Sequence, residues 1–335
     1  MSDTLRERGH DVFFVADRNK ELVKVIRDAG YEVATIPAGK LRRYFSWRHF
    51  VDPFLVCAGF FRSIRILQKQ SPDVVFSKGG FVALPMVVAS WLMRTPVVVH
   101  ESDATAGWAN RISARLAKRV ATGFGDVSAR DEKFVFTGNP VRPTITTGSV
   151  SRARRHFRLS TTHPTLLVLG GSQGSQAINE AVRDALPRLL RELQVIHVVG
   201  PAKLTDIGAT PIGYHPVGYL HDSLRDAYAV ADIVVSRAGA SVLAELAATG
   251  TPAVVIPLPT SANNHQAQNA ERFAEVGAAE VLRQNSLSGR ELSRVVLKLL
   301  HDPQRRSSLS RAIKRLATPD AASRLSTVIE EAAHV

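Results

Sequence analysis

Short apolar runs alternate along most of the chain with longer stretches in which apolar residues recur every three or four positions. The short runs are typical of buried strands, and the longer period is typical of helices. Their alternation predicts an α/β fold of parallel, doubly wound sheets. The expected strands are 11–16, 31–36, 73–76, 96–100, 134–137, 165–169, 194–199, 216–217, 233–235, 254–258 and 280–282, and the expected helices are 3–8, 20–29, 84–93, 108–118, 177–190, 242–248, 290–299, 306–316 and 320–333.

The alternation of expected strands and helices occurs in two rounds along the chain. A proline-containing stretch at 138–143 (GNPVRP) lies between them. We expect an N-terminal domain at 1–143, a linker at 144–163, a C-terminal domain at 164–317, and a final helix at 318–335 that returns toward the N-terminal domain. The first round opens on a helix, whereas doubly wound folds usually open on their central first strand and its Gly-rich turn.

Composition narrows the class of protein. The 335 residues are 45% hydrophobic, which suits two domains with packed cores, and the single cysteine excludes a disulfide framework. The charged start predicts no signal peptide, and no apolar run is long enough to span a bilayer. The net charge of +13 predicts an anionic partner, but no nucleic-acid-binding module is recognisable, so we expect no nucleic acid. The Gly-rich turn at 170–176 lacks the third glycine of the dinucleotide fingerprint, which argues against NAD.

A candidate phosphate site lies at 233–250. An apolar run there ends in a turn of small residues, 238–241, and a helix pattern follows. A strand that enters a helix through such a turn leaves backbone N–H groups and the positive end of the helix dipole facing a ligand. Glu245 lies one turn into the helix, where it could accept hydrogen bonds from ribose hydroxyls. The alternative is an ordinary connection with a solvated Glu.

A polar cluster follows this helix and the next buried strand. Its amides and imidazole suit recognition of sugar hydroxyls, and its members are Asn263, Asn264, His265, Gln266, Gln268 and Asn269. The cluster favours a sugar-nucleotide site over an ordinary turn.

Two loops of the first half also follow expected strands. In the stretch 77–85 (SKGGFVALP), Gly79 and Gly80 could bring backbone amides to a second phosphate. In the stretch 100–110 (HESDATAGWAN), Glu101 and Asp103 stand at the carboxyl end of a strand, where open α/β sheets bind ligands. Helix capping is the default for Asp103, and Glu101 is a candidate general base.

The segment from Lys40 to Lys69 mixes aromatic and apolar residues with six or more cations and contains one acid, Asp52. Such a mixture indicates an amphipathic surface that rests on anionic lipid head groups. A core helix with a rim of arginines is an equal alternative, and an RNA-binding face is a weaker one.

Six motifs, in order and spacing, resemble the MurG family over nearly the whole chain: KGGFVALP, HESDATAGWANR, TGNPVR, LGGSQGSQAIN, SRAGASVLAE and NHQAQNA. The resemblance implies the GT-B architecture, two Rossmann-like domains that face a cleft. It implies a hexosyltransferase that moves N-acetylglucosamine from UDP-GlcNAc to undecaprenyl-linked lipid I, with inversion, to form lipid II for peptidoglycan. It also implies a peripheral protein on the cytoplasmic face of the bacterial cell membrane, with no metal or cofactor, and other cell-wall enzymes as further partners.

The resemblance assigns roles to particular positions. Glu245 matches the ribose-binding acid, and Leu220 matches the position whose backbone meets the uracil. The other donor-binding positions implied are Arg142, Ser172, Gln173, Gly239, Ala240, Ser241, Val242, Gln266 and Asn269. The implied acceptor-binding positions are Gly79, Gly80, Phe81 and Asp103.

Two departures from the family pattern change these expectations. Asp103 stands where many members carry Asn, and an ionised carboxylate cannot donate as an amide does. The family's opening strand and Gly-rich loop, with its candidate catalytic His, have no counterpart in residues 1–15. We therefore expect a shortened sequence that binds UDP-GlcNAc better than it turns it over, with Glu101 as the reserve base.

Two other functions stay open at this point. One is another UDP-sugar enzyme of the same architecture, such as a UDP-GlcNAc 2-epimerase, although the basic aromatic segment favours a lipid-linked acceptor. The other is a catalytically silent UDP-sugar-binding subunit that needs a partner.

Overall fold

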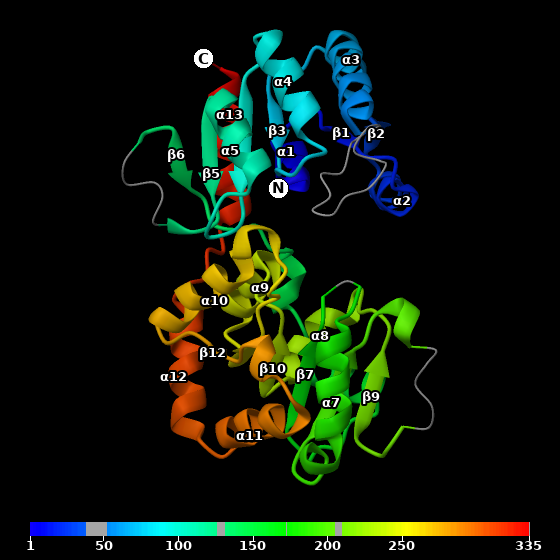
Figure 1. Cartoon of the computed structure of the whole chain (residues 1–335), viewed down its shortest axis with the longest axis vertical. Coiled ribbons are helices and arrows are strands. Elements are labelled where there is room, and N and C mark those ends of the chain that lie inside the picture. The colour runs from blue at the N-terminus through cyan, green and yellow to red at the C-terminus, as the bar shows by residue number, and fades with distance from the viewer. Residues whose placement is uncertain (38–51, 126–130, 172, 205–209, 335) are drawn as a thin grey trace. The chain divides into compact units, whose positions relative to one another are not determined.

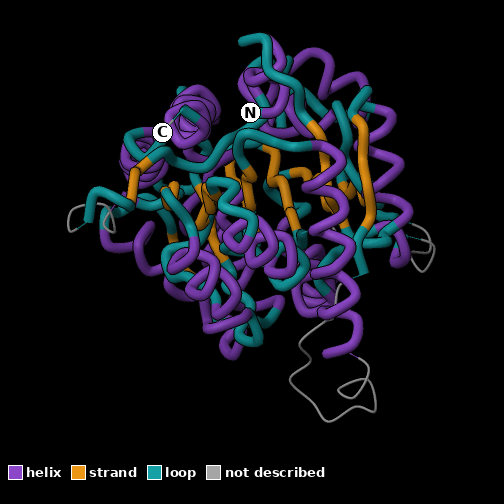
Figure 2. Tube along the Cα trace, turned by 90° about the horizontal axis from the view of Figure 1, so that it is seen from above, coloured by secondary structure: helices purple, strands orange, loops and turns teal. Residues whose placement is uncertain are grey.

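The structure is a computed structural model that describes all residues except 38–51, 126–130, 172, 205–209 and 335. The chain divides into two compact units, Met1–Pro140 with Asp320–Val335, and Val141–Pro319. In both units parallel strands carry helices on their faces, and Figure 2 shows strands (orange) running between helices (purple).

The N-terminal unit alternates strands and helices as the sequence predicts. Its elements are α1 (Ser2–Glu7), β1 (Phe13–Ala16), α2 (Lys20–Asp28), β2 (Glu32–Thr35), α3 (Asp52–Gln70), β3 (Val75–Ser77), α4 (Leu84–Leu92), β4 (Val97–Glu101), α5 (Trp108–Leu116), β5 (Arg119–Thr122), β6 (Phe134–Phe136) and α13 (Ala321–Ala333). The strand β5, which directly follows α5, was not predicted from the sequence. It starts right after the expected helix 108–118, and only its last three residues, Val120–Thr122, are buried.

Both faces of β4 are buried, because alternate side chains of a strand point to opposite sides of the sheet. Val97 and Val99 pack in a cluster with Val87 of α4, and Val98 packs with Leu325 of α13. All three valines are at most 1% exposed. This explains why the strand reads as a continuous apolar run.

The sheet of the N-terminal unit is broken into two parts. Strands β1 and β2 pair with each other, and β3, β4, β5 and β6 form a separate parallel sheet. Val15 of β1 and Val75 of β3 nevertheless pack against one cluster with Leu67 and Met86, so the two parts share a layer.

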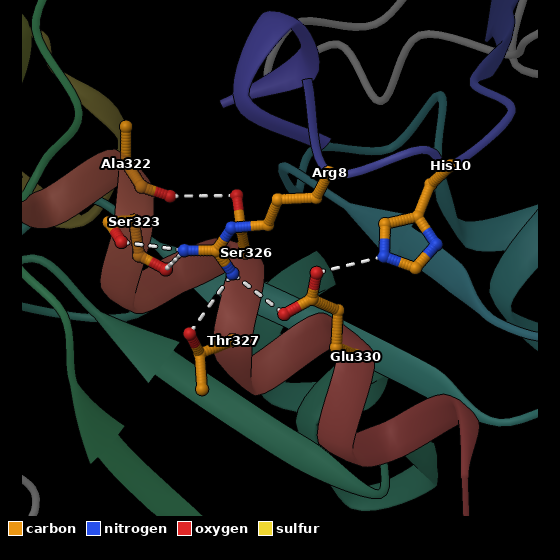
Figure 3. A network of polar contacts seen from close by, with 7 residues as sticks. All are labelled: Arg8, His10, Ala322, Ser323, Ser326, Thr327 and Glu330. Atoms are coloured by element: carbon orange, nitrogen blue, oxygen red, sulfur yellow. Dashed lines mark hydrogen bonds and ion pairs between the residues drawn. The ribbon is translucent and has the colours of Figure 1, made fainter. Parts of the chain in front are cut away.

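Helix α13 returns to the N-terminal unit after the chain has formed the other one (Figure 1). Its buried side is apolar, and its other contacts fasten it to the turn between α1 and β1 (Figure 3). Nη1 of Arg8 donates to Oε2 of Glu330 over 2.7 Å, and Nη2 donates to Oγ of Ser323 over 2.6 Å. Nε2 of His10 lies 2.8 Å from Oε1 of the same glutamate. The last helix and the first turn therefore form one polar network.

The C-terminal unit has one continuous parallel sheet with the order β12-β11-β10-β7-β8-β9. Its strands are β7 (Thr165–Leu169), β8 (Gln194–Val198), β9 (Tyr214–Val217), β10 (Ile233–Ser236), β11 (Ala253–Val255) and β12 (Glu280–Val281). Its helices are η3 (Pro143–Thr146), α6 (Val150–Phe157), α7 (Gln176–Leu189), η4 (Pro201–Lys203), α8 (Ser223–Val230), α9 (Ala240–Thr249), η5 (Ala262–Asn264), α10 (His265–Glu275), η6 (Gln284–Ser286), α11 (Gly289–Leu300) and α12 (Pro303–Lys314). One face of β7 and β10 packs with α7 and α11 into the main core cluster.

The stretch expected to be a linker, 144–163, differs from that expectation. It belongs to the C-terminal unit and contains α6. Ser149 caps this helix by accepting a hydrogen bond from the N–H of Arg152. Ala153 and Phe157, four positions apart, are the buried positions of α6, which the surrounding arginines hide in the sequence pattern.

Candidate active site

The strand order indicates a candidate ligand site at the carboxyl ends of β7 and β10. The chain leaves β7 toward β8 and β9 on one side and comes back to form β10 on the other side of β7. Such a switch point is where open α/β sheets bind ligands. Each of the two strands runs through a turn of small residues into a helix, α7 or α9. Both turns noted in the sequence therefore meet at one edge of the sheet.

The turn after β7 is packed too tightly for side chains at two of its glycines. A Cβ at Gly174, whose φ is +68°, would overlap the carbonyl oxygen of Val199, and a Cβ at Gly170 would press on the backbone of Ser175. Ser175 then caps α7 by accepting from the N–H of Ile178 over 3.4 Å. Gln173 is exposed in this turn, and Ser172 lies outside the described residues.

The turn after β10 starts α9 with no side-chain cap. Gly239 is the N-cap residue, in extended backbone conformation, and a Cβ there would meet open space. Ala240 is buried, Ser241 is exposed and Val242 is half-buried. Because no side chain caps these first N–H groups, the helix start can bind an anion through backbone donors and the helix dipole.

A buried arginine, Arg237, ties the two turns together. Its Nη2 donates to Oγ of Ser175 over 2.6 Å, and its Nη1 donates to the carbonyl oxygen of Ile256 over 3.1 Å. Burial lowers the pKa of this guanidinium from its usual value. Sequence reasoning quoted Arg237 within a motif without singling it out, although a lone Arg in a stretch of small and apolar residues was the available signal.

Glu245 lies one turn into α9, as the sequence predicts, and is half-buried. Its Oε2 accepts a hydrogen bond of 3.0 Å from the hydroxyl of Tyr228 on α8. Burial raises the pKa of Glu245 above its usual value, and the hydrogen bond from Tyr228 and the charge of Arg142 only reduce this rise. Leu220, which precedes α8, is 5% exposed.

Gln266, Gln268 and Asn269 lie on a helix, α10, that the sequence pattern did not reveal. Asn263 and Asn264 both have positive φ, which Asn tolerates better than most residues, and they set the start of this helix. Nδ2 of Asn269 donates to the carbonyl oxygen of Ala238 over 3.0 Å, and Oε1 of Gln266 accepts from the N–H of Leu258 over 3.0 Å. Both amides thus hold the backbone around the site.

In the N-terminal unit the candidate residues form a compact network around Asn110. Its Oδ1 accepts from the N–H of Gly80 over 3.3 Å, and its Nδ2 donates to Oε2 of Glu101 over 2.7 Å. Oε1 of Glu101 accepts from the N–H of Asp103 over 3.1 Å. Gly79, whose φ is +90°, has no room for a Cβ beside Asn110. The network joins both predicted loops, and Asn110 is the member that sequence reasoning missed.

This network defines what Glu101 does in the structure. Both carboxylate oxygens accept hydrogen bonds, and the residue is 9% exposed. The arrangement holds the loop after β4, and the use of Glu101 as a base stays a prediction. Phe81, on the Gly-rich loop, is half-buried.

Known proteins resemble this chain over most of its length. Residues 1–122 match the Glycosyltransferase family 28 N-terminal domain, and residues 165–325 match the Glycosyltransferase family 28 C-terminal domain. The UDP-N-acetylglucosamine--N-acetylmuramyl-(pentapeptide) pyrophosphoryl-undecaprenol N-acetylglucosamine transferase of Geobacillus thermodenitrificans is 37% identical over 305 residues, 90% of this chain and 86% of that one. The transferase of the same name from Lachnospira eligens is 38% identical over 303 residues, 89% of this chain and 85% of that one.

Solved structures share the architecture. The crystal structure of Acinetobacter baumannii MurG has a TM-score of 0.76 and 25% identity, and covers 98% of this chain and 93% of that one. UDP-GlcNAc 2-epimerase from Neisseria meningitidis has a TM-score of 0.67 at 11% identity, covering 96% and 100%, which shows the fold alone. The predicted GT-B architecture with two parallel-sheet domains is confirmed, and so is the resemblance that the six motifs carried. The chain belongs to the MurG family, the UDP-N-acetylglucosamine–N-acetylmuramyl-(pentapeptide) pyrophosphoryl-undecaprenol N-acetylglucosamine transferases.

Proposed function

We propose that this protein transfers N-acetylglucosamine from UDP-GlcNAc to undecaprenyl-linked lipid I and so forms lipid II for peptidoglycan. The relatives named above carry this activity in their names. The observation that carries the proposal furthest is the start of α9. It combines an uncapped helix N-terminus at the switch point of the sheet with a carboxylate, Glu245, one turn further on. A diphosphate and the ribose beside it are the ligand groups that suit this pair.

In the proposed reaction a hydroxyl oxygen of lipid I bonds to the anomeric carbon of the sugar. The bond from that carbon to the diphosphate oxygen breaks, UDP leaves, and the configuration at the carbon inverts. The N–H groups at the start of α9 stabilise the negative charge that grows on the leaving diphosphate. The hydroxyl proton passes to a base, for which Glu101 stays our prediction.

The remaining residues are proposed as binding groups. In the C-terminal unit the donor would contact Arg142, Ser172, Gln173, Leu220, Gly239, Ala240, Ser241, Val242 and Gln266. In the N-terminal unit the acceptor would contact Gly79, Gly80, Phe81 and Asp103. Asn269 is fully buried and bonded to Ala238, so we assign it to shaping the turn at the start of α9.

Transfer of labelled N-acetylglucosamine from UDP-GlcNAc to a short-chain lipid I analogue tests the proposal. Glu245→Ala should lower kcat/KM about ten- to a hundredfold, the range expected for losing a hydrogen bond to a charged group. Glu291→Ala is the matched control, because Glu291 pairs with Arg294 on the surface of α11. If the protein converts UDP-GlcNAc to its 2-epimer without an acceptor, the epimerase replaces this function. If it binds UDP-GlcNAc without transferring the sugar, the binding subunit replaces it.

We also propose that the N-terminal unit rests on the cytoplasmic face of the cell membrane. Large apolar side chains are exposed on α3 and at the end of α4, among them Phe54 at 77%, Phe61 at 64% and Trp91 at 55%. Phe54 and Phe61 are seven positions apart and share a helix face, and Arg62 and Arg65 are exposed beside them. Residues 40–51 of the predicted membrane segment lie outside the described residues. Among the described helices, none is both long and apolar enough to cross a membrane.

Sedimentation with vesicles of anionic and of neutral lipid tests this placement. Replacing Phe54 and Phe61 together by Ser should reduce binding to anionic vesicles, whereas Val276→Ser, at an exposed apolar position of the C-terminal unit, should not. Equal binding by both variants would contradict the proposal.

A further inference from the structure

A hydrogen bond between two helices fixes the position of the Glu245 carboxylate. The hydroxyl of Tyr228, on α8, donates to Oε2 of Glu245, on α9, over 3.0 Å. Tyr228 is 2% exposed, so its ring is held by packing on all sides. Burial, followed by the charge of Glu245, raises the pKa of Tyr228 well above its usual value, and the phenol therefore stays a donor.

The segment that carries Arg142 is fastened to the same helix α8. Oδ1 of Asp226 accepts from the N–H of Ser149 over 2.7 Å, and both oxygens of Asp226 accept from the guanidinium of Arg152. Gly148 packs against the carbonyl oxygen of Arg225, with no room for a Cβ. These contacts hold residues 148–152 on α8 and limit where Arg142, six residues upstream, can lie.

Two groups outside α9 therefore act on Glu245. The phenol of Tyr228 holds one oxygen, and the positive charge of Arg142 partly offsets the rise in pKa that burial causes. Within the part of the chain that the structure describes, the other oxygen, Oε1, accepts no hydrogen bond. An ionised carboxylate can accept on both oxygens, so Oε1 is available to a ligand hydroxyl.

We propose that Tyr228 is a positioning residue, which orients the Glu245 carboxylate so that Oε1 accepts from a ribose hydroxyl of the sugar nucleotide. This inference rests on the proposed function, because it assumes that Glu245 meets the ribose of a UDP-sugar. It adds a residue from α8 to the ribose contact that Glu245 of α9 is proposed to make. It also explains a buried tyrosine hydroxyl whose partner is a half-buried acid.

Calorimetric binding of UDP-GlcNAc and of its 2′,3′-dideoxyribose analogue to the full chain tests the proposal. Tyr228→Phe should raise the Kd for UDP-GlcNAc about tenfold, because the carboxylate loses its fixed orientation. The same variant should leave the Kd for the dideoxy analogue unchanged, since that ligand offers no hydroxyl to Glu245. In a Glu245→Ala background, Tyr228→Phe should have no further effect on either Kd.

Tyr214→Phe is the matched control. Tyr214 is 4% exposed in the same unit, and its hydroxyl lies 3.0 Å from Nδ1 of His197, so this variant also loses a buried hydrogen bond. It should lower the melting temperature without changing either Kd. The positioning role would be overturned if Tyr228→Phe raised the Kd for both ligands, or if Tyr214→Phe raised the Kd for UDP-GlcNAc by as much as Tyr228→Phe. If the unaltered chain binds neither ligand, donor binding itself fails, and this inference fails with it.

Discussion

The two units share one alternation of strands and helices but differ in how their sheets are joined. In the C-terminal unit, β7 lies in the interior of the sheet and pairs with β8 on one side and β10 on the other. In the N-terminal unit, no described strand joins β1 to β3, and the two parts of the sheet are held by helices that pack across them. The alternation of strands and helices therefore gives each unit a layer of strands covered by helices. It does not by itself make the sheet continuous, which depends on the strand at the centre of the sheet.

The candidate sites of the two units also differ in how their loops are joined. In the C-terminal unit, glycines and a buried arginine lock the turns at neighbouring strand ends to one another. In the N-terminal unit, one amide, Asn110, links the loops after β3 and β4. Four predictions test how much each unit depends on these contacts.

The largest effect is expected for Gly174→Ala in the C-terminal unit. The added Cβ would overlap the carbonyl oxygen of Val199, and we expect the free energy of unfolding to fall by about 3 kcal/mol. Gly277→Ala is the matched control, because Gly277 has the same φ of +68° with nothing within 4 Å of a Cβ. It should cost only about 1–2 kcal/mol for the left-handed backbone. Chemical denaturation of both variants measures the difference, and equal losses would show that the close contact is unimportant.

In the N-terminal unit, Asn110→Ala should destabilise by about 2 kcal/mol, because it removes the hydrogen bond to a buried carboxylate oxygen of Glu101 and the hydrogen bond from the N–H of Gly80. Transfer to the lipid I analogue should fall, while the Kd for UDP-GlcNAc stays unchanged, since the donor site that we propose lies in the C-terminal unit. Asn285→Ala, at an exposed position, controls for loss of an amide. A weakened Kd for the donor would contradict this division of roles.

One buried histidine in each unit makes stability depend on pH. Burial lowers the pKa of His100 to about 4 and that of His197 to about 3, from 6.5. Both folded pKa values lie below the unfolded value, so the unfolded chain binds more protons as the pH falls below about 6.5. At about pH 5, each histidine should therefore reduce the free energy of unfolding by about 2 kcal/mol.

Melting temperatures measured between about pH 7 and pH 5 test this dependence. His100→Gln and His197→Gln should each remove about half of the loss that the two residues cause together. If neither variant changes the slope, other groups determine the response to acid.

The smallest effect is expected for Glu330→Gln on α13. Burial raises the pKa of Glu330, but its hydrogen bonds with His10 and Arg8 outweigh this effect and lower it. The contribution of ionised Glu330 to the free energy of unfolding should be present above the pKa of the unfolded state, about 4.5. It should be lost as the pH falls through the lower pKa of the folded state. Near neutral pH the substitution should cost about 1 kcal/mol in thermal unfolding. Glu331→Gln, the exposed neighbour, should cost less, and an equal cost would argue against the network.

The inner strands β7 and β10 of the C-terminal unit could be predicted from the sequence because they are buried on both faces. The expected strand 165–169 matches β7 at both ends, and the expected 233–235 is β10 without its last residue. A buried parallel strand needs a continuous apolar run, which is a local signal. By contrast, α10 begins after two asparagines with left-handed backbone, and polar residues fill most of its first turn. The start of this helix therefore looks like a polar loop in the sequence.

The site residues that sequence reasoning missed are those whose role depends on a distant partner. Tyr228 meets Glu245 across 17 positions, and Arg237 meets Ser175 across 62. Neither residue belongs to a local pattern that implies the contact. The glycines and Glu245, in contrast, stand on a strand, turn and helix whose sequence alone indicates anion binding.

The return of α13 has a consequence for synthesis on the ribosome. Residues 141–319 form a contiguous unit whose sequence lies between the two segments of the N-terminal unit. The side chains of α13 that cover Val98 and Ala121 are therefore made only after that whole unit. We expect the nascent first half to expose an apolar face until α13 has emerged, and we expect a chaperone to bind this face.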